Sequence, residues 1–124
     1  MAARRLLLVE DEDLVRMLLA TYLGDLGFEV TLAGTAAEAK DKMRLLGSVL
    51  VGAVIDMSLP DGQGLALLGE LRVLQPNLAA IISSGYDLER FQSSLAGARS
   101  VEYLKKPFTR QQLQEALRNV GVNP

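Results

Sequence analysis

Short apolar runs alternate along the chain with longer stretches in which apolar residues recur at helical spacing. Five of the runs predict strands, at residues 6–9, 28–33, 49–56, 78–82 and 101–104. The run at 49–56 carries no charge until its last residue, Asp56, which is typical of a strand covered by helices on both faces. The turn formers Pro60, Asp61 and Gly62 then end the segment. We therefore expect Asp56 at the carboxyl end of a central strand.

The spacing between the first strands predicts two capped helices. The residues that share one face of the first helix are Leu14, Met17, Leu18, Tyr22 and Leu26. Asp13 is expected to cap this helix, and Gly27 to stop it. Thr35 and Glu38 form a capping box for a second helix that reaches about residue 46. Its inward residues are expected to be Ala36, Ala39, Met43 and Leu46.

Three further helices are predicted in the second half of the chain. One spans residues 63–75 and ends before Pro76. Its residues available for burial are Leu65, Leu68, Leu71 and Leu74. A short fourth helix would contain Leu88, Phe91 and Leu95. A second capping box, Thr109 with Gln112, opens a last helix that reaches about residue 120.

Five alternations of strand and helix predict an α/β fold whose parallel strands are joined by right-handed crossovers. The 124 residues suffice for one domain with a core of its own, and we find no internal repeat, linker or output domain within residues 1–124. No apolar run approaches the ~20 residues that a membrane span needs. The apolar run after Arg5 is too short for a signal peptide, so we expect a cytoplasmic protein without membrane insertion.

Composition narrows the possible chemistry. The chain has no cysteine and no histidine, which excludes thiol nucleophiles, disulfides, Ser-His-Asp triads and most zinc or iron sites. A net charge of −2 provides no general basic field, so we expect no direct contact with nucleic acid. The remaining options are carboxylates, hydroxyls, lysines and a hard cation held by oxygen ligands.

The polar residues at the strand ends suggest such a site. Glu10 and Asp11, Asp56, Ser83 and Lys106 each follow or end a predicted strand, and parallel strands bring these ends to one edge of the sheet. Carboxylates brought that close need a compensating cation, for which Mg²⁺ is the natural candidate. Phosphoryl transfer uses sites of this kind, with an aspartate as nucleophile. Lys106 would then hold one phosphoryl oxygen, and Ser83 would donate to another.

Each of these residues also has a purely structural interpretation. Asp56 alone is equally consistent with bracing a turn. Residues 10–13 are consistent with a solvated acidic helix start, the interpretation we keep for Glu12 and Asp13. Ser83 is also consistent with a loop serine whose hydroxyl bonds the backbone, and Lys106 is consistent with an ordinary surface lysine. Only the predicted convergence at one edge favours a functional site.

Four motifs resemble the receiver domain of bacterial two-component response regulators over nearly the whole chain. They are VEDE at 9–12, DMSLPDGQG at 56–64, ISSGY at 82–86 and YLKKPF at 103–108. The resemblance implies a flavodoxin-like, doubly wound sheet of five strands in the order 2-1-3-4-5, with five helices. It also implies that Asp56 accepts a phosphoryl group from a histidine kinase or a histidine phosphotransfer protein, and that a downstream effector reads the result. Such a domain would catalyse its own phosphorylation and dephosphorylation while serving mainly as a switch.

The same resemblance implies roles for single residues. Asp11 and Asp56 would bind Mg²⁺ directly, Glu10 through water, and Ser58 through its backbone carbonyl. Ser83 and Tyr103 would form the switch, and the Lys106–Pro107 bond is often cis in the family. The family often signals through its fourth helix, fifth strand and fifth helix. In this chain that face would include Phe91, Tyr103 and Gln112.

Some positions differ from the common pattern of the family, and other functions remain possible from the sequence. Glu10 replaces the usual aspartate, and Ser84 stands where alanine is common. Ser58 and Gly85 offer little bulk near the cleft, which leaves the lifetime of the phosphorylated state open. The alternatives are a receiver-like binding module that is never phosphorylated, a haloacid-dehalogenase-like phosphatase and a flavin or dinucleotide binder. The phosphatase family has a second aspartate where this chain has Ser58, and no Gly-x-Gly-x-x-Gly follows the first strand.

Overall fold

The computed structural model describes residues 3–85 and 100–124. Its centre is a five-stranded parallel sheet with the strand order β2-β1-β3-β6-β7. The strands are β1 (Arg5–Val9), β2 (Glu29–Ala33), β3 (Leu50–Asp56), β6 (Ala79–Ser84) and β7 (Val101–Lys105). The predicted parallel sheet and its 2-1-3-4-5 order are confirmed, and each strand lies within about two residues of its predicted bounds.

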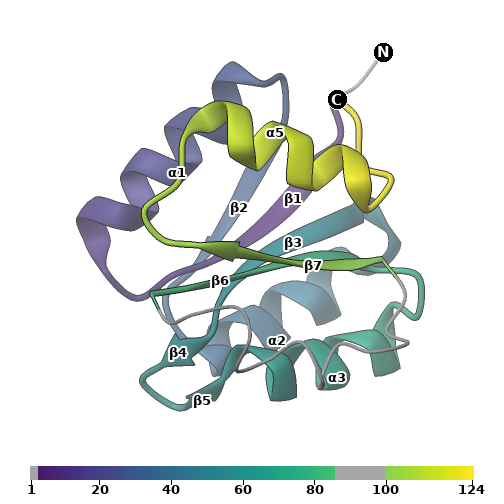
Figure 1. Cartoon of the computed structure of the whole chain (residues 1–124). Helices are drawn as coiled ribbons and strands as arrows, with labels where there is room; N and C mark the ends of the chain where they lie inside the picture. Colours follow the sequence, from purple (N-terminus) through teal and green to yellow (C-terminus); the bar gives the residue numbers. More distant parts are fainter. Residues whose placement is uncertain (1–2, 86–99) are drawn as a thin grey trace.

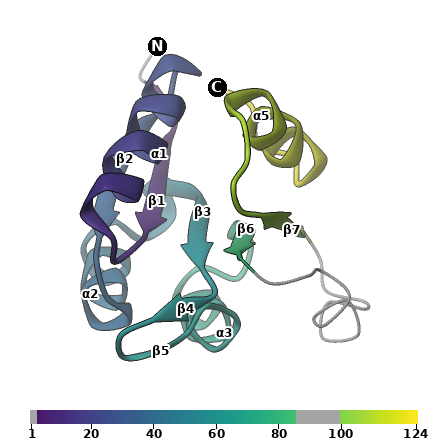
Figure 2. The ribbon, with the colours of Figure 1, turned by 60° about the vertical axis from the view of Figure 1, so that its left-hand side comes forward.

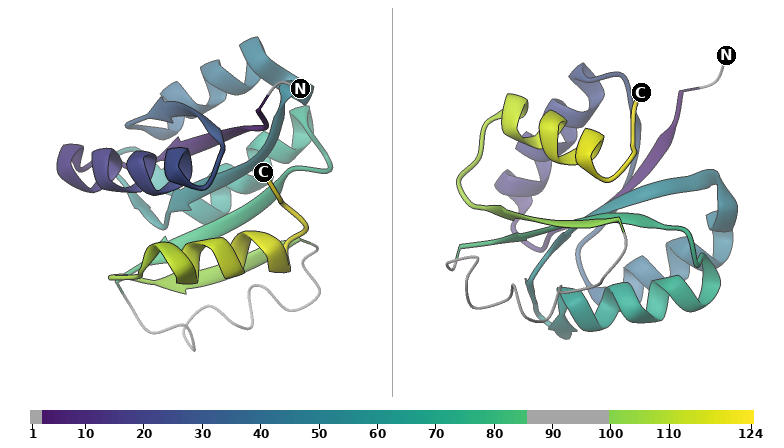
Figure 3. Two further views of the ribbon diagram at one scale, coloured as in Figure 1. Left: turned by 90° about the horizontal axis from the view of Figure 1, so that it is seen from above. Right: turned by 45° about the vertical axis from the view of Figure 1, so that its right-hand side comes forward.

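Helices cover both faces of this sheet (Figures 1 and 3). α1 (Asp13–Asp25) and α5 (Arg110–Asn119) lie on one face, whereas α2 (Ala36–Leu46) and α3 (Gly64–Leu74) lie on the other. A 3₁₀ turn, η1 (Gly47–Val49), leads from α2 into β3. The predicted fourth helix, with Leu88, Phe91 and Leu95, lies outside the described residues, as does the expected interface residue Phe91.

Two hydrophobic layers hold the sheet between the helices. Side chains of β1 alternate between them: Leu7 and Val9 pack toward α2 and α3, and Leu6 and Leu8 pack toward α1 and α5. All four are fully buried, and burial of one such side chain stabilises the fold by ~1.5–3 kcal/mol. Strand β3 is buried on both faces in the same way, as its uninterrupted apolar run predicts.

The predicted apolar face of α1 is only partly correct: Tyr22 and Leu26 are half-buried and pack against the core. Leu14, Met17 and Leu18 are exposed, at 81%, 64% and 50%, and the buried residues are instead Leu19 and Leu23. Leucines occur on more than one side of this helix, so helical spacing fits two faces about equally well. The direction in which the chain leaves β1 selects between them, and the periodicity carries no information about it.

Of the two predicted ends of α1, the C-terminal one is correct and the N-terminal one is not. The N-cap is Glu12 and makes no side-chain cap bond, while Asp13 is the first helical residue and pairs with Arg16. Gly27 lies just past the last helical turn with φ of +100°, a value that favours glycine. The prediction of Asp13 as the cap is therefore wrong, and that of Gly27 as the stop is confirmed.

The other helix predictions hold with small changes. Ala36, Ala39 and Met43 are buried, as expected. The Thr35 hydroxyl accepts from the Glu38 amide. The Glu38 carboxylate, however, accepts from the Gly34 amide instead of the Thr35 amide, so the capping box is shifted by one residue on that side. In α3, Leu68 and Leu71 are buried, whereas Leu74 is half exposed and its place in the core is taken by Leu67. The Thr109–Gln112 capping box is complete.

No helix among residues 3–85 and 100–124 combines the length and the apolar character that crossing a membrane demands.

Candidate functional site

Three carboxylates meet at the carboxyl edge of the sheet. Glu10 and Asp11 directly follow β1, and Asp56 is the last residue of β3. Figure 2 shows the ends of β1 and β3 pointing toward the same edge, above the β4–β5 hairpin. One carboxylate oxygen of each residue lies within 4.8 Å of the other two. Glu10 and Asp56 are buried and Asp11 is exposed, so the cluster opens to solvent on the Asp11 side.

Lys106 is the cation that faces these carboxylates. Its Nζ lies 2.6 Å from Glu10 Oε1 and 3.3 Å from Asp56 Oδ1. Burial lowers the pKa of Lys106, but the hydrogen bond to Glu10 and the charges of Asp56 and Glu10 outweigh it, so the pKa is raised overall. Its neighbour Lys105 is exposed, in agreement with the strand alternation. The Lys106–Pro107 peptide bond is cis.

Glu10 is held in place by bonds around its backbone and side chain. Its amide donates to the Ala33 carbonyl at 3.0 Å, and its carbonyl accepts from Arg16 Nη1 at 2.8 Å. Its second carboxylate oxygen accepts from the Glu12 amide at 3.2 Å. Both carboxylate oxygens of this buried residue therefore have a partner, one of them Lys106.

The chain after Asp56 turns back on itself beside the cluster. β4 (Ser58–Leu59) pairs with β5 (Gly62–Gln63), and the Met57 amide donates to the Ser83 carbonyl at 2.8 Å. A Cβ on Gly64 would lie 2.5 Å from the Asp56 carbonyl oxygen. Only glycine therefore lets α3 begin this close to the end of β3. Gly64 belongs to the DMSLPDGQG motif at 56–64, but this steric role has no signal in the sequence pattern.

The structure brings the predicted site residues together to different degrees. Glu10, Asp11, Asp56 and Lys106 form one cluster. Ser83 is buried and stands directly opposite Asp56 in the β3–β6 register. The exposed Ser58 lies two residues beyond Asp56, and its amide is 3.4 Å from Asp56 Oδ1.

Tyr103 lies in β7, on the strand next to the one that carries Ser83. It pairs with Ile82, one residue before Ser83, and its side chain is only 7% exposed. It belongs to the hydrophobic layer that faces α2 and α3, and burial raises the pKa of its phenol. The inward orientation that the resemblance implies for the switched state is thus already the one in this structure.

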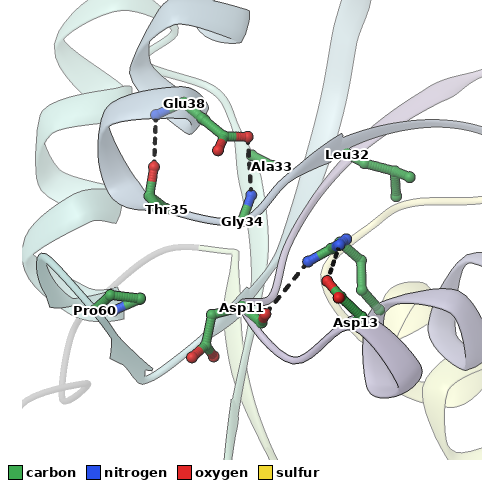
Figure 4. Close-up of a pocket in the computed structure, with 9 residues that line it drawn as sticks. Asp11, Asp13, Leu32, Ala33, Gly34, Thr35, Glu38 and Pro60 are labelled. Carbon is green, nitrogen blue, oxygen red and sulfur yellow. Dashed lines mark hydrogen bonds and ion pairs between the residues drawn. The ribbon is translucent and has the colours of Figure 1, made fainter.

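A groove of about 540 Å³ adjoins the cluster (Figure 4). Asp11 lies at one side, Pro60 of the hairpin at another, and Thr35 and Glu38 at the start of α2. Arg16 also lines it, and its guanidinium bonds the Asp13 carboxylate and the backbone carbonyls of Glu10 and Asp11. The groove gives a partner or ligand a solvent-open approach to Asp11.

Comparison with known proteins agrees with this geometry. The family model described as "Response regulator receiver domain" matches residues 6–118. The sensor kinase CckA of Brucella abortus is 36% identical over 114 residues, which cover 92% of this chain and 12% of that protein. The chain spans half or less of the length of the first curated relatives it matches.

Two solved structures illustrate the similarity in fold. A receiver domain protein from Clostridium thermocellum superposes with a TM-score of 0.84 at 26% identity, covering 96% of this chain and 94% of that one. The response regulator TrrA of Thermotoga maritima, solved in complex with Mg(2+)-BeF, superposes with a TM-score of 0.79 at 28% identity, covering 94% and 98%.

These matches discriminate among the candidate functions. They favour a receiver over a haloacid-dehalogenase-like phosphatase and over a dinucleotide binder, and receiver domains act together with histidine kinases. The acidic cluster of Glu10, Asp11 and Asp56 is of the type that holds Mg²⁺ in receivers. The chain belongs to the response regulator receiver domain family of two-component signalling.

Proposed function

We propose that this domain is a phospho-accepting switch in which Asp56 takes a phosphoryl group from a phosphohistidine. The donor would be a histidine kinase or a histidine phosphotransfer protein, and the reader a downstream effector. One observation carries the proposal: three carboxylates and the Lys106 ammonium meet at one edge of the sheet. A protein that only binds partners through its surface has no need to gather these charges.

The residues at this edge fit a magnesium ion. Three carboxylates face one ammonium, so the cluster has an excess of negative charge that a divalent cation would balance. All the donors are oxygens, the ligand type that Mg²⁺ prefers. Asp11 and Asp56 would bind it directly, Glu10 through water and Ser58 through its carbonyl. When bound, Mg²⁺ would neutralise charge on the phosphoryl oxygens.

The chemistry then rests on Asp56. A carboxylate oxygen of Asp56 forms a bond to phosphorus as the bond from phosphorus to the donor's imidazole nitrogen breaks, and the electron pair of that bond stays on the imidazole. Lys106 shifts from its carboxylate partners to hold one phosphoryl oxygen, which its raised pKa favours by keeping it cationic. Ser83, opposite Asp56, donates its hydroxyl to another.

The same site would also return the switch to its resting state. Water attacks phosphorus in the aspartyl phosphate, the bond to the Asp56 oxygen breaks, and inorganic phosphate leaves. Ser58 and Gly85 are small and do little to orient or exclude this water. Movement of the Ser83 hydroxyl toward the phosphoryl group would alter the packing around Tyr103 on the neighbouring strand and so change the surface that an effector reads.

Phosphorylation by acetyl phosphate tests the proposal. We expect the protein to gain the mass of one phosphoryl group in the presence of Mg²⁺, and to lose this reaction in EDTA and in the Asp56→Asn variant. Asp41→Asn, which removes an exposed aspartate of α2 that pairs with Arg44, is the matched control and should react as the wild type does. Reaction that persists in Asp56→Asn would refute the assignment. Absence of any reaction in the wild type, with beryllium fluoride also without effect, would favour an unphosphorylated binding module.

A further inference from the structure

Asp61, at the tip of the β4–β5 hairpin, makes a contact that the phosphoryl-transfer site itself does not explain. Its carboxylate reaches back to the start of α2, where Oδ1 accepts from the Ala36 amide at 2.8 Å and Oδ2 accepts from the Ala37 amide at 3.0 Å. Because both oxygens are used, the contact fixes the direction of the side chain as well as its distance.

These bonds complete the cap of α2. The first amides of a helix have no partner within the helix. Thr35 satisfies only the Glu38 amide through its hydroxyl, at 3.1 Å. Asp61 accepts from the amides of Ala36 and Ala37, which precede Glu38, and its negative charge lies at the positive end of the helix dipole. The hydrogen bonds from Ala36 and Ala37 lower the pKa of Asp61 below its ordinary value, so the carboxylate is ionised at neutral pH.

The hairpin is anchored at its base and at its tip. At the base, the Met57 amide donates to the Ser83 carbonyl, and the Gly64 amide donates to the Met57 carbonyl at 2.7 Å. At the tip, the Asp61 carboxylate accepts the two hydrogen bonds from the start of α2. Between these anchors lies Ser58, whose amide is near Asp56 Oδ1 and whose carbonyl is a proposed magnesium ligand.

The contact also fixes one side of the groove beside Asp11. Pro60 precedes Asp61 and lines the groove together with Thr35 and Glu38, which belong to the start of α2. Release of Asp61 would separate these two sides. α2 begins shortly after β2, and the carbonyl of Ala33, the last residue of β2, accepts a hydrogen bond from the Glu10 amide. Asp61 therefore links the loop after Asp56 to the part of the fold that supports Glu10.

We propose that Asp61 is a positioning residue of the site: by holding the hairpin against α2, it sets the geometry in which Ser58 and Asp56 bind Mg²⁺. Its own carboxylate is committed to α2 and is not part of the Glu10, Asp11 and Asp56 cluster. This inference rests on the proposed function, because it concerns the affinity of the same magnesium site.

The test compares two caps of the same helix. Asp61→Asn keeps the size of the side chain but turns a donor toward an amide that needs an acceptor. Thr35→Ala removes the other cap bond of α2 and leaves the hairpin contact intact. Magnesium affinity is measured for each full-length variant by calorimetry and by amide chemical shifts during titration with MgCl₂, and stability is measured by urea unfolding.

We expect both variants to lose stability, and only Asp61→Asn to lose magnesium affinity. Loss of an outer contact behind metal ligands typically weakens binding by about tenfold or more, and we expect a change of about tenfold for Asp61→Asn. Phosphorylation by acetyl phosphate should slow in parallel. An unchanged affinity in Asp61→Asn, or an equal loss in Thr35→Ala, would overturn the inference and leave Asp61 as a helix cap only.

A second variant breaks the contact from the helix side. Ala36 is the first residue of α2, where proline is well tolerated, and Thr35 before it is already extended. Ala36→Pro removes the amide that bonds Asp61 Oδ1 and leaves the hairpin sequence unchanged. It should weaken magnesium binding as Asp61→Asn does, and wild-type affinity would contradict the inference even if Asp61→Asn failed to fold. Wild-type protein that binds no Mg²⁺ would instead contradict the proposed function itself.

Discussion

Gly64 illustrates how a single residue shapes the site without chemistry of its own. The absence of a side chain lets the first residue of α3 approach the Asp56 carbonyl, and a Cβ would meet it at 2.5 Å. The sequence shows a glycine after a turn, which is an ordinary observation. The close approach depends on how β3, the hairpin and α3 meet in space, so the sequence pattern alone did not reveal it.

Gly64→Ala is expected to destabilise the fold by roughly 1–3 kcal/mol, as overpacking in a tight region does, and to weaken magnesium binding because Asp56 must move. Gly69→Ala is the matched control. It lies in the same helix, and within residues 3–85 and 100–124 a Cβ there meets no atom within 4 Å beyond the nearby backbone of the helix itself. It should stabilise α3 by up to ~1 kcal/mol. Urea unfolding measures both, and equal stability of the two variants would contradict this role of Gly64.

The carboxyl of Asp61 predicts a specific dependence on pH. Its folded-state pKa is lowered from the ordinary value of 3.8 by the bonds from Ala36 and Ala37. A carboxyl whose pKa is lowered by folding stabilises the protein at pH values above its unfolded-state pKa. This stability is lost as the pH falls through the folded-state pKa. The difference in unfolding free energy between wild type and Asp61→Asn should thus be constant near neutral pH and shrink only below pH 3.8. A difference that vanishes between pH 5 and 7 would show that the charge of Asp61 is not the cause.

Among the helices and strands, the sequence predicts where an element lies in the chain better than which face of it is buried. The capping boxes are local, so Thr109 with Gln112 could be recognised from their spacing, and α5 begins where they place it. The buried face of α1 is a tertiary property. Its leucines occupy several sides, and contact with the sheet selects Leu19 and Leu23 over Leu14 and Met17. The central strands β1, β3 and β6 were easier to predict, because a strand buried on both faces needs no choice of face.

Thr109→Ala should destabilise the protein by about 1 kcal/mol, the usual cost of removing an N-cap side chain. Thr109 accepts from the Gln112 amide at 3.1 Å, and Gln112 Oε1 accepts from the Thr109 amide at 2.8 Å. Thr109 is exposed, so no cavity is formed. Thr109→Ser retains the hydroxyl and should retain most of the stability. Thermal unfolding compares the three proteins, and a serine variant as unstable as the alanine variant would argue against the capping bond.

For the whole molecule, the predicted topology was enough to assemble the site. Glu10, Asp56 and Lys106 are distant in the sequence, and the parallel sheet brings them to one edge because each follows or ends a strand. Tyr103 was expected to respond to the switch, and it lies already buried. The contact of Asp61 with α2 was not foreseen, because residues 36 and 61 are joined only through the folded arrangement of hairpin and helix.

We propose that Glu10, Asp11 and Asp56 form a magnesium site at which Asp56 is the phosphoryl acceptor. A crystal structure of the protein with Mg²⁺ and beryllium fluoride tests it most directly. We expect beryllium fluoride on an Asp56 carboxylate oxygen, Mg²⁺ against Asp11, Asp56 and the Ser58 carbonyl, and Lys106 turned toward a fluoride. Beryllium fluoride bound at another carboxylate, or Mg²⁺ bound away from Asp11 and Asp56, would contradict the account.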